Sequence, residues 1–594
     1  MKIKLLSIAL LLCMIIPSLI ACNKHPGTTD TESSSEYESV SETIPLDKEV
    51  PIIENGKTNF VLVKPKNASG RELDLVLDFR STFEKRTGIK LEIRYENEDD
   101  ASNDDFEILI GDTLRPESKE ILKDLKFKEF FYGMVNNKLV IAGGSYESTK
   151  TAVNLFIRKH IDRDLSEDKK TFSFKISSNY VEKVRYPLSI FTISDTEARH
   201  YRIVYSEKDS FSAISFAKRL YSLICDRYGY KLELVADPKD SSPYEIVIGE
   251  KLANNIKTEK DSINIECKDG KLYLSCDYST GYAYFYDYLN KKLTNSKELS
   301  YANGDNETVA LSTLFKGGSE NILQKSGSVR IMVNNIWCFN EDDAPATLRA
   351  QQLAELYEDY APDVLGLQEF SGVVKSSITP LIKKLGYTEV PYTERNASFA
   401  IATPLYYNPD TLELITSGFF RYTDDSGDKS KAIGWGIFKE KATGKIFGAG
   451  STHFYWTSDD LGKESRIIDA KDLSKLVKEL SDRYDCPIFV GGDFNCKVGS
   501  DPLNILNANG FKDVELVAKK TELNGTHHSY PKFDMDLKVC TTYYTANGDH
   551  TNAIDHMFGY NLDKVTVNLY DVVEDYFALA SSDHCPVYID ITLN

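Results

Sequence analysis

Strand-length apolar runs between residues 329 and 594 repeatedly stop at a short cluster of polar side chains. The clearest is CPIFVGGDFNC, where the run 488–490 is followed by two glycines and then by Asp493 and Asn495. The β-branched and aromatic residues of this run predict a strand. Because residues two apart in extended backbone share a face, we expect Asp493 and Asn495 to point the same way, with Phe494 turned into the core. The chain must therefore fold so that a buried strand ends at a polar site.

The same pattern recurs through the rest of this stretch, and helical spacing of apolar residues over 345–360 adds a helix between two of the runs. Any one of the polar residues could cap a turn or carry a surface charge. Polar residues that recur where buried strands stop instead indicate a site built at strand ends. The residues concerned are Asn335, Glu369, His453, Asp555, Asp583 and His584.

These residue types suit chemistry on phosphate groups. If the four carboxylates of the set converge, like-charge repulsion raises some of their pKa values, and a hard divalent cation relieves it. Oxygen ligands, in a stretch without a C-x-x-C pair, favour Mg²⁺, Mn²⁺ or Ca²⁺ over zinc. Two histidines beside such ligands can neutralise a phosphate oxygen while a carboxylate positions water. The four carboxylates are those of Glu369, Asp493, Asp555 and Asp583.

Six motifs at these strand ends resemble those of the endonuclease/exonuclease/phosphatase superfamily, the DNase I-like metal-dependent phosphoesterases. They occur in the order of that family and span nearly all of 329–594. The resemblance implies a two-layer β-sandwich flanked by helices, with the site at one end. It also implies a phosphoester hydrolase, either a nuclease or another phosphodiesterase or a phosphatase. The motifs are NNIW (334–337), LQEF (367–370), STHF (451–454), GGDFN (491–495), IDHMF (554–558) and SDHCPV (582–587).

The resemblance assigns metal ligands residue by residue. Glu369 matches the principal ligand of the family, with Asn335 beside it. Asp583 matches an additional ligand. The expected cofactor is Mg²⁺ or Mn²⁺, with Ca²⁺ as a further candidate.

The resemblance also assigns catalytic roles. Asp493 matches the residue that aligns or activates the attacking water, and Asn495 matches its neighbour on the phosphate side. His453 matches a phosphate contact or an acid for the leaving group. His584 matches a transition-state donor or general base, held in one tautomer by Asp555.

The substrate is less constrained than the reaction. The formal charge of −19 and the isoelectric point near 5.1 repel nucleic acid at long range, and fit the basic, cytosolic abasic-site endonucleases poorly. The tryptophan–cysteine–Asp–Arg motif usual in inositol phosphatases is absent at the IDHMF position. Extracellular nucleic acid, a phospholipid headgroup and a sugar phosphate remain as candidate substrates.

Two other functions fit parts of the sequence. The chain could be a non-catalytic surface protein that binds glycan and carries a degenerate phosphoesterase scaffold, although a scaffold without chemistry does not need the complete polar set. A glycosidase would use two carboxylates without an Asp–His pair or a metal cluster.

Two segments upstream resemble each other at an offset of 138 residues, FEILIGDTLRPES from Phe106 and YEIVIGEKLANNI from Tyr244. Each lies in the predicted order strand–helix–strand–strand–strand–helix, so two small α/β sandwich domains are expected, at 58–180 and 198–300. They resemble small domains that precede catalytic domains in some bacterial carbohydrate-active enzymes. This implies either glycan or cell-wall contact or a spacer role. A glycine- and serine-rich linker is expected over 301–328. The whole chain is thus expected to be α+β.

The N-terminus has the pattern of a targeting segment. Lys2 and Lys4 precede an apolar run over 5–21 that is short for a membrane-spanning helix. The run ends in LIAC, which resembles the bacterial lipobox. This implies a signal peptide over 1–21 and a lipidated Cys22. The polar, acidic stretch 22–57 is expected to be a disordered tether. We therefore expect a cell-membrane lipoprotein that faces the extracytoplasmic side.

Overall fold

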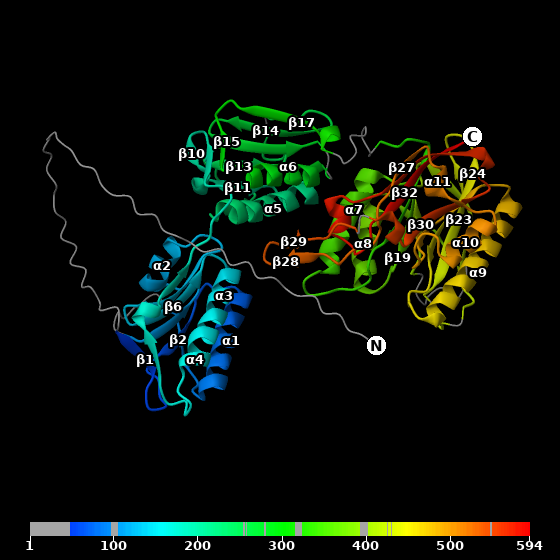
Figure 1. The fold of residues 1–594 in the computed structure, drawn as a ribbon. Helices are drawn as coiled ribbons and strands as arrows, with labels where there is room; N and C mark the ends of the chain where they lie inside the picture. The colour runs from blue at the N-terminus through cyan, green and yellow to red at the C-terminus, as the bar shows by residue number, and fades with distance from the viewer. Residues whose placement is uncertain are drawn as a thin grey trace, which may run out of the picture.

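The computed structural model describes residues 48–594 apart from 97–104, 254–255, 257, 278, 280, 315–323, 393–401, 425, 429 and 547–548. Among the described residues, no helix combines the length and the apolar character needed to cross a membrane. The expected signal peptide, Cys22 and nearly all of the expected tether lie outside them. The described chain forms three sheet-containing units in sequence order (Figure 1).

The first unit, called repeat 1 below, is a six-stranded sheet in the order β3-β2-β4-β6-β5-β8. Its strands β3, β2, β4 and β6 are parallel, and β5 forms an antiparallel hairpin with β6. Helices α1 and α3 pack on one face of the sheet and α2 packs on the other. The elements are β2 (Val61–Lys64), α1 (Gly70–Thr87), β3 (Glu92–Tyr95), β4 (Glu107–Ile110), α2 (Pro116–Lys123), β5 (Phe130–Val135), β6 (Lys138–Gly143), α3 (Tyr146–Phe156) and β8 (Tyr180–Glu182).

The second unit, repeat 2, has the same topology strand for strand, in the order β12-β11-β13-β15-β14-β17. Helices α5 and α6 bury their apolar faces against one side of its sheet. A small three-stranded sheet, β10-β9-β16, flanks it. The elements are β9 (Ile190–Ile193), β10 (Thr196–Glu197), β11 (Arg202–Tyr205), α5 (Phe211–Tyr228), β12 (Glu233–Ala236), β13 (Glu245–Ile248), β14 (Ser262–Lys268), β15 (Lys271–Cys276), α6 (Gly281–Asn295), β16 (Glu298–Tyr301) and β17 (Asn306–Ala310).

The boundaries and strand count of the repeats differ from the sequence prediction. Each sheet has two strands more than expected, β5 and β8 in repeat 1 and β14 and β17 in repeat 2, and β5 and β14 each form a hairpin with the strand that follows. The expected tether 22–57 contains β1 (Glu49–Ile53), which pairs with β7 (Phe172–Lys175), and the expected linker 301–328 contains β17, which pairs with β14. Both missed strands are short edge strands held by backbone hydrogen bonds, so their side chains give a weak pattern.

The third unit, the C-terminal domain, is a two-layer β-sandwich flanked by helices, as expected. A seven-stranded sheet, β20-β21-β19-β18-β32-β31-β27, faces a six-stranded sheet, β22-β23-β24-β25-β30-β26, across a shared apolar core. Helices α7 and α8 cover the outer face of the first sheet, and α9 and α10 cover that of the second (Figure 1).

The helix expected over 345–360 is confirmed as α7. The bounds in this domain are β18 (Val329–Asn335), α7 (Ala346–Tyr360), β19 (Val364–Gln368), α8 (Gly372–Lys384), β20 (Thr388–Glu389), β21 (Leu405–Tyr407), β22 (Leu412–Arg421), β23 (Ala432–Glu440), β24 (Ile446–His453), α9 (Asp460–Tyr484), β25 (Ile488–Asp493), α10 (Asp501–Ala508), β26 (Lys512–Asp513), α11 (Val514–Val517), β27 (Lys520–Glu522), β28 (Lys532–Asp534), β29 (Val539–Thr542), β30 (Asp555–Tyr560), β31 (Val565–Val572), α12 (Tyr576–Leu579) and β32 (Val587–Leu593).

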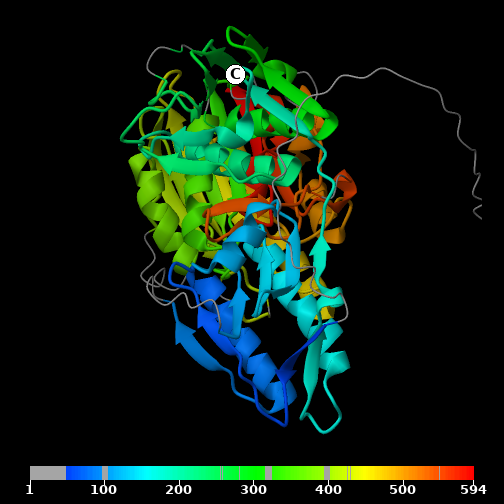
Figure 2. The same cartoon turned by 90° about the vertical axis from the view of Figure 1, so that its left-hand side faces the viewer.

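Repeat 2 docks on the C-terminal domain through α5, which lies beside α7 and the β28–β29 hairpin (Figure 1). The guanidinium of Arg219 on α5 lies 3.6 Å from the ring centre of Tyr286 and 3.5 Å from that of Tyr576. Repeat 1 contacts repeat 2, where the amide of Phe127 donates to the carbonyl of Gly229 at 2.9 Å. In Figure 2, repeat 1 (blue to cyan) lies below repeat 2.

Candidate active site

Three neighbouring strands of the six-stranded sheet end in register at one edge. His453 at the end of β24 pairs with Asp493 at the end of β25, and Asp493 pairs with Asp555 at the start of the antiparallel β30. On the facing sheet, Asn335 at the end of β18 pairs with Gln368 at the end of β19. The pairing of these strands explains why residues far apart in the sequence gather at one end of the sandwich.

Asp555 and His584 form a buried pair. Nδ1 of His584 lies 2.8 Å from Oδ2 of Asp555, and the two residues are 5% and 1% exposed. Burial acts against the charged imidazole, but the carboxylates of Asp555, Asp493 and Asp583 outweigh it and raise the pKa of His584 well above its usual value. A charged His584 in this position donates through Nδ1 to Asp555 and presents its Nε2 proton towards Asp493, whose Oδ2 is 3.9 Å away.

Asp493 lies at the centre of the cluster and is 2% exposed. Its Oδ2 accepts from Nδ2 of Asn335 at 3.1 Å and lies 3.4 Å from Nε2 of His453. Burial, reinforced by Asp555 and opposed by the charge of His584, raises the pKa of Asp493 to about 7. A carboxylate with that pKa can both hold and release a proton near neutral pH.

The turn after β25 differs in one respect from the sequence prediction. Phe494 is confirmed as a core residue, packed at the centre of the apolar cluster below α9. The strand ends at Asp493, however, and Asn495 has a left-handed φ of 49°, so the extended-strand argument fails there. The amide of Asn495 donates to Oδ1 of Asp493 at 2.8 Å, and its side chain donates to the carbonyl of Phe454 at 3.1 Å. Asn495 therefore fixes the orientation of Asp493 through its backbone.

Glu369 follows β19 directly and has a left-handed φ of 57°, a conformation that costs energy for a residue with a side chain. Its Oε2 accepts from the amide of Cys338 at 2.9 Å, and its Oε1 accepts from Nδ2 of Asn335 at 3.3 Å. Burial opposes ionisation of Glu369, but these hydrogen bonds and the charge of His584 outweigh it and lower the pKa. Glu369 is therefore held as a carboxylate.

Asp583 shares this region with Glu369. Burial raises the pKa of Asp583, His584 opposes the change, and the charge of Glu369 adds to it. Two carboxylates that repel each other are ligands of the kind that fit a hard divalent cation. Asn335 turns its Nδ2 towards Glu369, and its Oδ1 accepts from the amide of Trp337 at 3.1 Å. Among the described residues, the groups whose ligand atoms converge are Asp493–Asp555–His584 and His527–Asp583–His584.

The structure adds two residues that the sequence analysis missed. Lys431, directly before β23, is 5% exposed, and its ammonium lies 2.9 Å from Nε2 of His453. With the ammonium as donor, Nε2 is the unprotonated nitrogen. Burial and the charge of Lys431 lower the pKa of His453 well below its usual value. This favours the phosphate-contact role for His453 over the role of leaving-group acid. The ring of His527 lies edge-on to His584 with 4.9 Å between centres.

Neither residue had a signal that the strand-end pattern could detect. Lys431 precedes its strand in a polar segment that reads as a surface turn, and His527 lies in the long connection between β27 and β28. Thr526 lies in the same connection and holds the backbone at the start of β30. Its hydroxyl accepts from the amides of Ile554 and Asp555, both at 3.0 Å.

Residues 335–584 match the model of the Endonuclease/Exonuclease/phosphatase family, and this match supports that superfamily for the C-terminal domain. Members of this family hydrolyse phosphoesters. The chain is also similar to solved structures. An endonuclease/exonuclease/phosphatase from Bacteroides vulgatus is 24% identical, with a TM-score of 0.36, over 45% of this chain and 99% of that one. A mannosyl-6-phosphatase from Bacteroides thetaiotaomicron is 21% identical, with a TM-score of 0.35, over 44% and 99%. The human Nocturnin catalytic domain with bound sulfate is 17% identical, with a TM-score of 0.34, over 46% and 97%. No curated protein matches the chain.

Proposed function

We propose that this chain is a divalent-metal-dependent phosphoester hydrolase, held on the outer side of the cell membrane by a lipid on Cys22. The observation that carries the catalytic proposal is the buried Asp555–His584 pair pointing at Asp493. Burying two carboxylates and an imidazole together costs stability, and such arrangements concentrate at functional sites. The LIAC sequence that ends the apolar run 5–21 supports the anchor.

In this proposal His584 stabilises charge in the transition state. Its Nδ1 proton is donated to Asp555, which fixes the tautomer and the ring plane. Its Nε2 proton is then available to a phosphoryl oxygen on which negative charge develops. A donor that is already oriented in a site shielded from water is worth more than the same donor in solution.

Asp493 positions the attacking water and takes its proton. The amide of Asn495 and the side chain of Asn335 hold the carboxylate in place from two sides. A pKa of about 7 lets this carboxylate act as a general base near neutral pH. Lys431 and His453 lie beside it, where Nε2 of His453 accepts from the ammonium of Lys431 and that ammonium supplies a positive charge for another phosphoryl oxygen.

Glu369, Asn335 and Asp583 are the residues that would hold the divalent cation, Mg²⁺ or Mn²⁺, with Ca²⁺ as a third candidate. When bound, the cation supplies a Lewis acid that offsets charge on the phosphate. The chain prepares this position itself, because the amide of Cys338 and the side chain of Asn335 hold Glu369 ionised and oriented.

The substrates we propose are a phosphoester of extracellular nucleic acid, a phospholipid headgroup or a sugar phosphate. The test is hydrolysis by the chain 23–594, without its lipid, of bis(p-nitrophenyl) phosphate, p-nitrophenyl phosphate, DNA, RNA, sphingomyelin and sugar phosphates. Turnover of at least one of these, lost in His584→Ala, supports the proposal. Failure to turn over any member of the panel with Mg²⁺, Mn²⁺ or Ca²⁺ present favours a non-catalytic scaffold.

We also propose that the two repeats contact glycan or cell wall. The shared topology of the repeats is compatible with a spacer as well as with a binding domain. A cavity in repeat 1 distinguishes the two repeats.

A further inference from the structure

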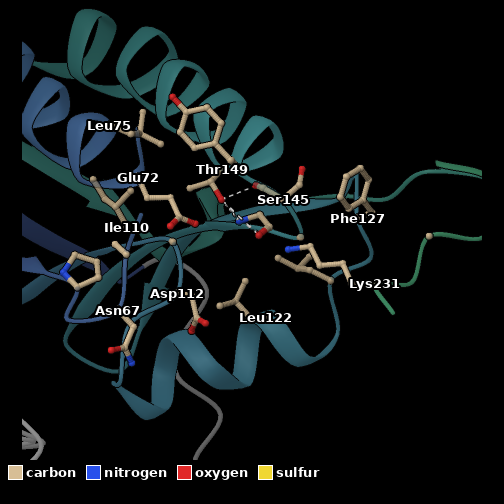
Figure 3. Close-up of a pocket in the computed structure, with 18 of the residues that line it drawn as sticks. Asn67, Glu72, Leu75, Ile110, Asp112, Leu122, Phe127, Ser145, Thr149 and Lys231 are labelled. Carbon is tan, nitrogen blue, oxygen red and sulfur yellow. Dashed lines mark hydrogen bonds between the residues drawn. The ribbon is translucent and has the colours of Figure 1, made fainter. Parts of the chain in front are cut away.

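Repeat 1 has a cavity of about 370 Å³ at the carboxyl ends of its parallel strands (Figure 3). In the sheet, β2 and β4 are neighbours. The strand after β2 in the chain, β3, lies on the outer side of β2, whereas β6, which the chain reaches from β4 through α2 and β5, lies on the opposite side, next to β4. The loops after β2 and β4 therefore separate, and both line the cavity. In open α/β sheets this crevice, where the strand order reverses, is the position at which ligands bind. The volume falls within the range of about 300–1,000 Å³ that is usual for small-molecule sites.

Repeat 2 provides an internal comparison for this crevice. Ser69 caps α1 in repeat 1, and Ser210 caps α5 in repeat 2, each at the end of the loop that follows the equivalent strand. The residue before the cap is Ala68 in repeat 1 and Asp209 in repeat 2. The two repeats thus differ by a carboxylate at the mouth of the same crevice.

Two equivalent glycines show what that carboxylate does. Gly111 after β4 and Gly249 after β13 are related by the 138-residue offset and both have a positive φ, 74° and 82°. A methyl group on Gly111 would meet nothing nearer than Cγ2 of Thr149 at 3.8 Å. A methyl group on Gly249 would lie 2.5 Å from Oδ2 of Asp209. Asp209 therefore packs onto Gly249 and fills the position that is open in repeat 1.

The same edge of repeat 2 is also occupied by the C-terminal domain. The carboxylate of Glu355 on α7 accepts from the amide of Phe211 and from the hydroxyl of Ser212, both at 2.9 Å, in the first turn of α5. Repeat 2 thus uses this edge for docking between domains. In repeat 1 the equivalent crevice remains a cavity, and Gly229, Tyr230 and Lys231 of repeat 2 line part of it.

The residues that line the repeat 1 cavity indicate the chemistry of its ligand. Leu75, Ile110 and Leu122 provide an apolar wall, and Phe127 adds an aromatic ring at the rim (Figure 3). The polar groups come from separate elements. Two carboxylates line the cavity beside the ammonium of Lys231, and Asp112 also pairs with Lys119, so the cavity has no excess of positive charge to attract an anion. Amide and carboxylate groups beside apolar and aromatic surface suit a ligand with many hydroxyls and an apolar ring face. The polar groups that face the hollow include Asn67, Glu72, Asp112 and Lys231.

We propose that this cavity binds a neutral sugar residue of a glycan. This rests on the glycan contact proposed above and confines it to repeat 1, because in repeat 2 the equivalent site is used for domain docking. Asn67 donates to and accepts from sugar hydroxyls at the mouth, Asp112, which also accepts from the ammonium of Lys119 at 2.5 Å, accepts from them, and the apolar wall contacts the ring face. Glu72 adds a carboxylate from the first turn of α1, where it also accepts from the amide of Ser69 at 2.7 Å. The proposal does not depend on the phosphoesterase activity.

The test is calorimetric titration of the chain 23–594 with neutral hexoses, pentoses, N-acetylhexosamines and their disaccharides, with uronic acids and sugar phosphates as the anionic comparison. Binding to an insoluble polysaccharide of the best sugar then distinguishes a glycan from a free sugar as the ligand. Ala68→Asp copies the closing residue of repeat 2 and should abolish binding. Asp112→Ala removes an exposed carboxylate and should weaken binding about tenfold or more.

Glu250→Ala is the matched control, because Glu250 is the exposed acid of repeat 2 at the position equivalent to Asp112. It should bind as the parent does, and all three variants should keep the parent phosphoesterase rate. Since Asp112 is exposed, its variant tests the site even if Ala68→Asp fails to fold. Three results would each overturn the proposal: no binding of any neutral sugar, binding of anionic sugars alone, or sugar binding that Asp112→Ala leaves unchanged.

Discussion

Asp555→Asn removes the charge that holds His584 protonated while leaving the shape of the side chain nearly the same. The hydrogen bond between Oδ2 and Nδ1 is 2.8 Å long and is shielded from water on both sides. A hydrogen bond to a charged group of this kind contributes about 1.5–3 kcal/mol. If that energy is needed mainly in the transition state, kcat falls about 10- to 100-fold.

The His584→Ala variant sets the scale for the comparison. It removes the donor itself, and acid–base contributions of single side chains run to about 10²–10⁴-fold in rate. Since Asp555 acts only through His584, the double variant should be little slower than His584→Ala alone. The assay is kcat for the best substrate of the panel, at saturating substrate and metal.

Asp571→Asn is a suitable control for the loss of a buried carboxylate. Asp571 lies in the same domain, near the end of β31, and its carboxylate accepts from the hydroxyl of Tyr588 at 3.0 Å and is not one of the proposed site residues. It should keep the parent kcat. If the losses in Asp555→Asn and His584→Ala simply multiply in the double variant, the two residues act independently and the roles proposed for them are wrong.

Three further predictions come from the structure and one, at Cys22, comes from the sequence. Mg²⁺ or Mn²⁺ should raise the melting temperature of the parent chain, because a ligand that binds the folded state stabilises it, and the more so the tighter it binds. Glu369→Gln should make this rise smaller. A rise of unchanged size would show that Glu369 is not a metal ligand. Lys431→Met should raise KM or lower kcat for phosphoesters while the melting temperature stays within a few degrees, and parent kinetics would exclude its phosphate role. Cys22→Ser should release the protein from the membrane fraction or leave an unprocessed precursor, whereas a processed variant that still sediments with membranes would contradict the anchor. Burial raises the pKa of Asp469 to about 8, so this carboxyl keeps its proton in the folded state while the unfolded state ionises above about pH 4. The parent therefore loses stability as pH rises from about 4 to 8, and Asp469→Asn should be increasingly stabilised relative to it in urea titrations over that range; a constant difference would contradict the raised pKa.

The strand-end pattern predicted where the site residues lie because the pairing of the strands brings the residues at their ends together. Once β24, β25 and β30 pair in register, His453, Asp493 and Asp555 become neighbours without any further information. Asp269 and Gly270, between β14 and β15, form a two-residue turn with positive φ at both positions, and this places Cys267 opposite Leu272.

The parts that the sequence did not predict depend on tertiary contacts. Lys431 belongs to the site only because β23 pairs with β24 and brings its ammonium to His453. Asn495 leaves the extended conformation because its amide turns back to Asp493, which no period-two pattern can show. The open crevice of repeat 1 depends on a single alanine, Ala68, whose importance appears only beside Asp209 in the other repeat.

The central claim, that the C-terminal domain uses a divalent cation to hydrolyse phosphoesters, is tested most directly by one titration. The rate of hydrolysis by the chain 23–594 is measured for the best substrate, first in excess EDTA and then as Mg²⁺ or Mn²⁺ is added back. We predict loss of activity in EDTA and full recovery with the metal, with recovery in Glu369→Gln shifted to higher metal concentration. Full activity in excess EDTA would contradict the account.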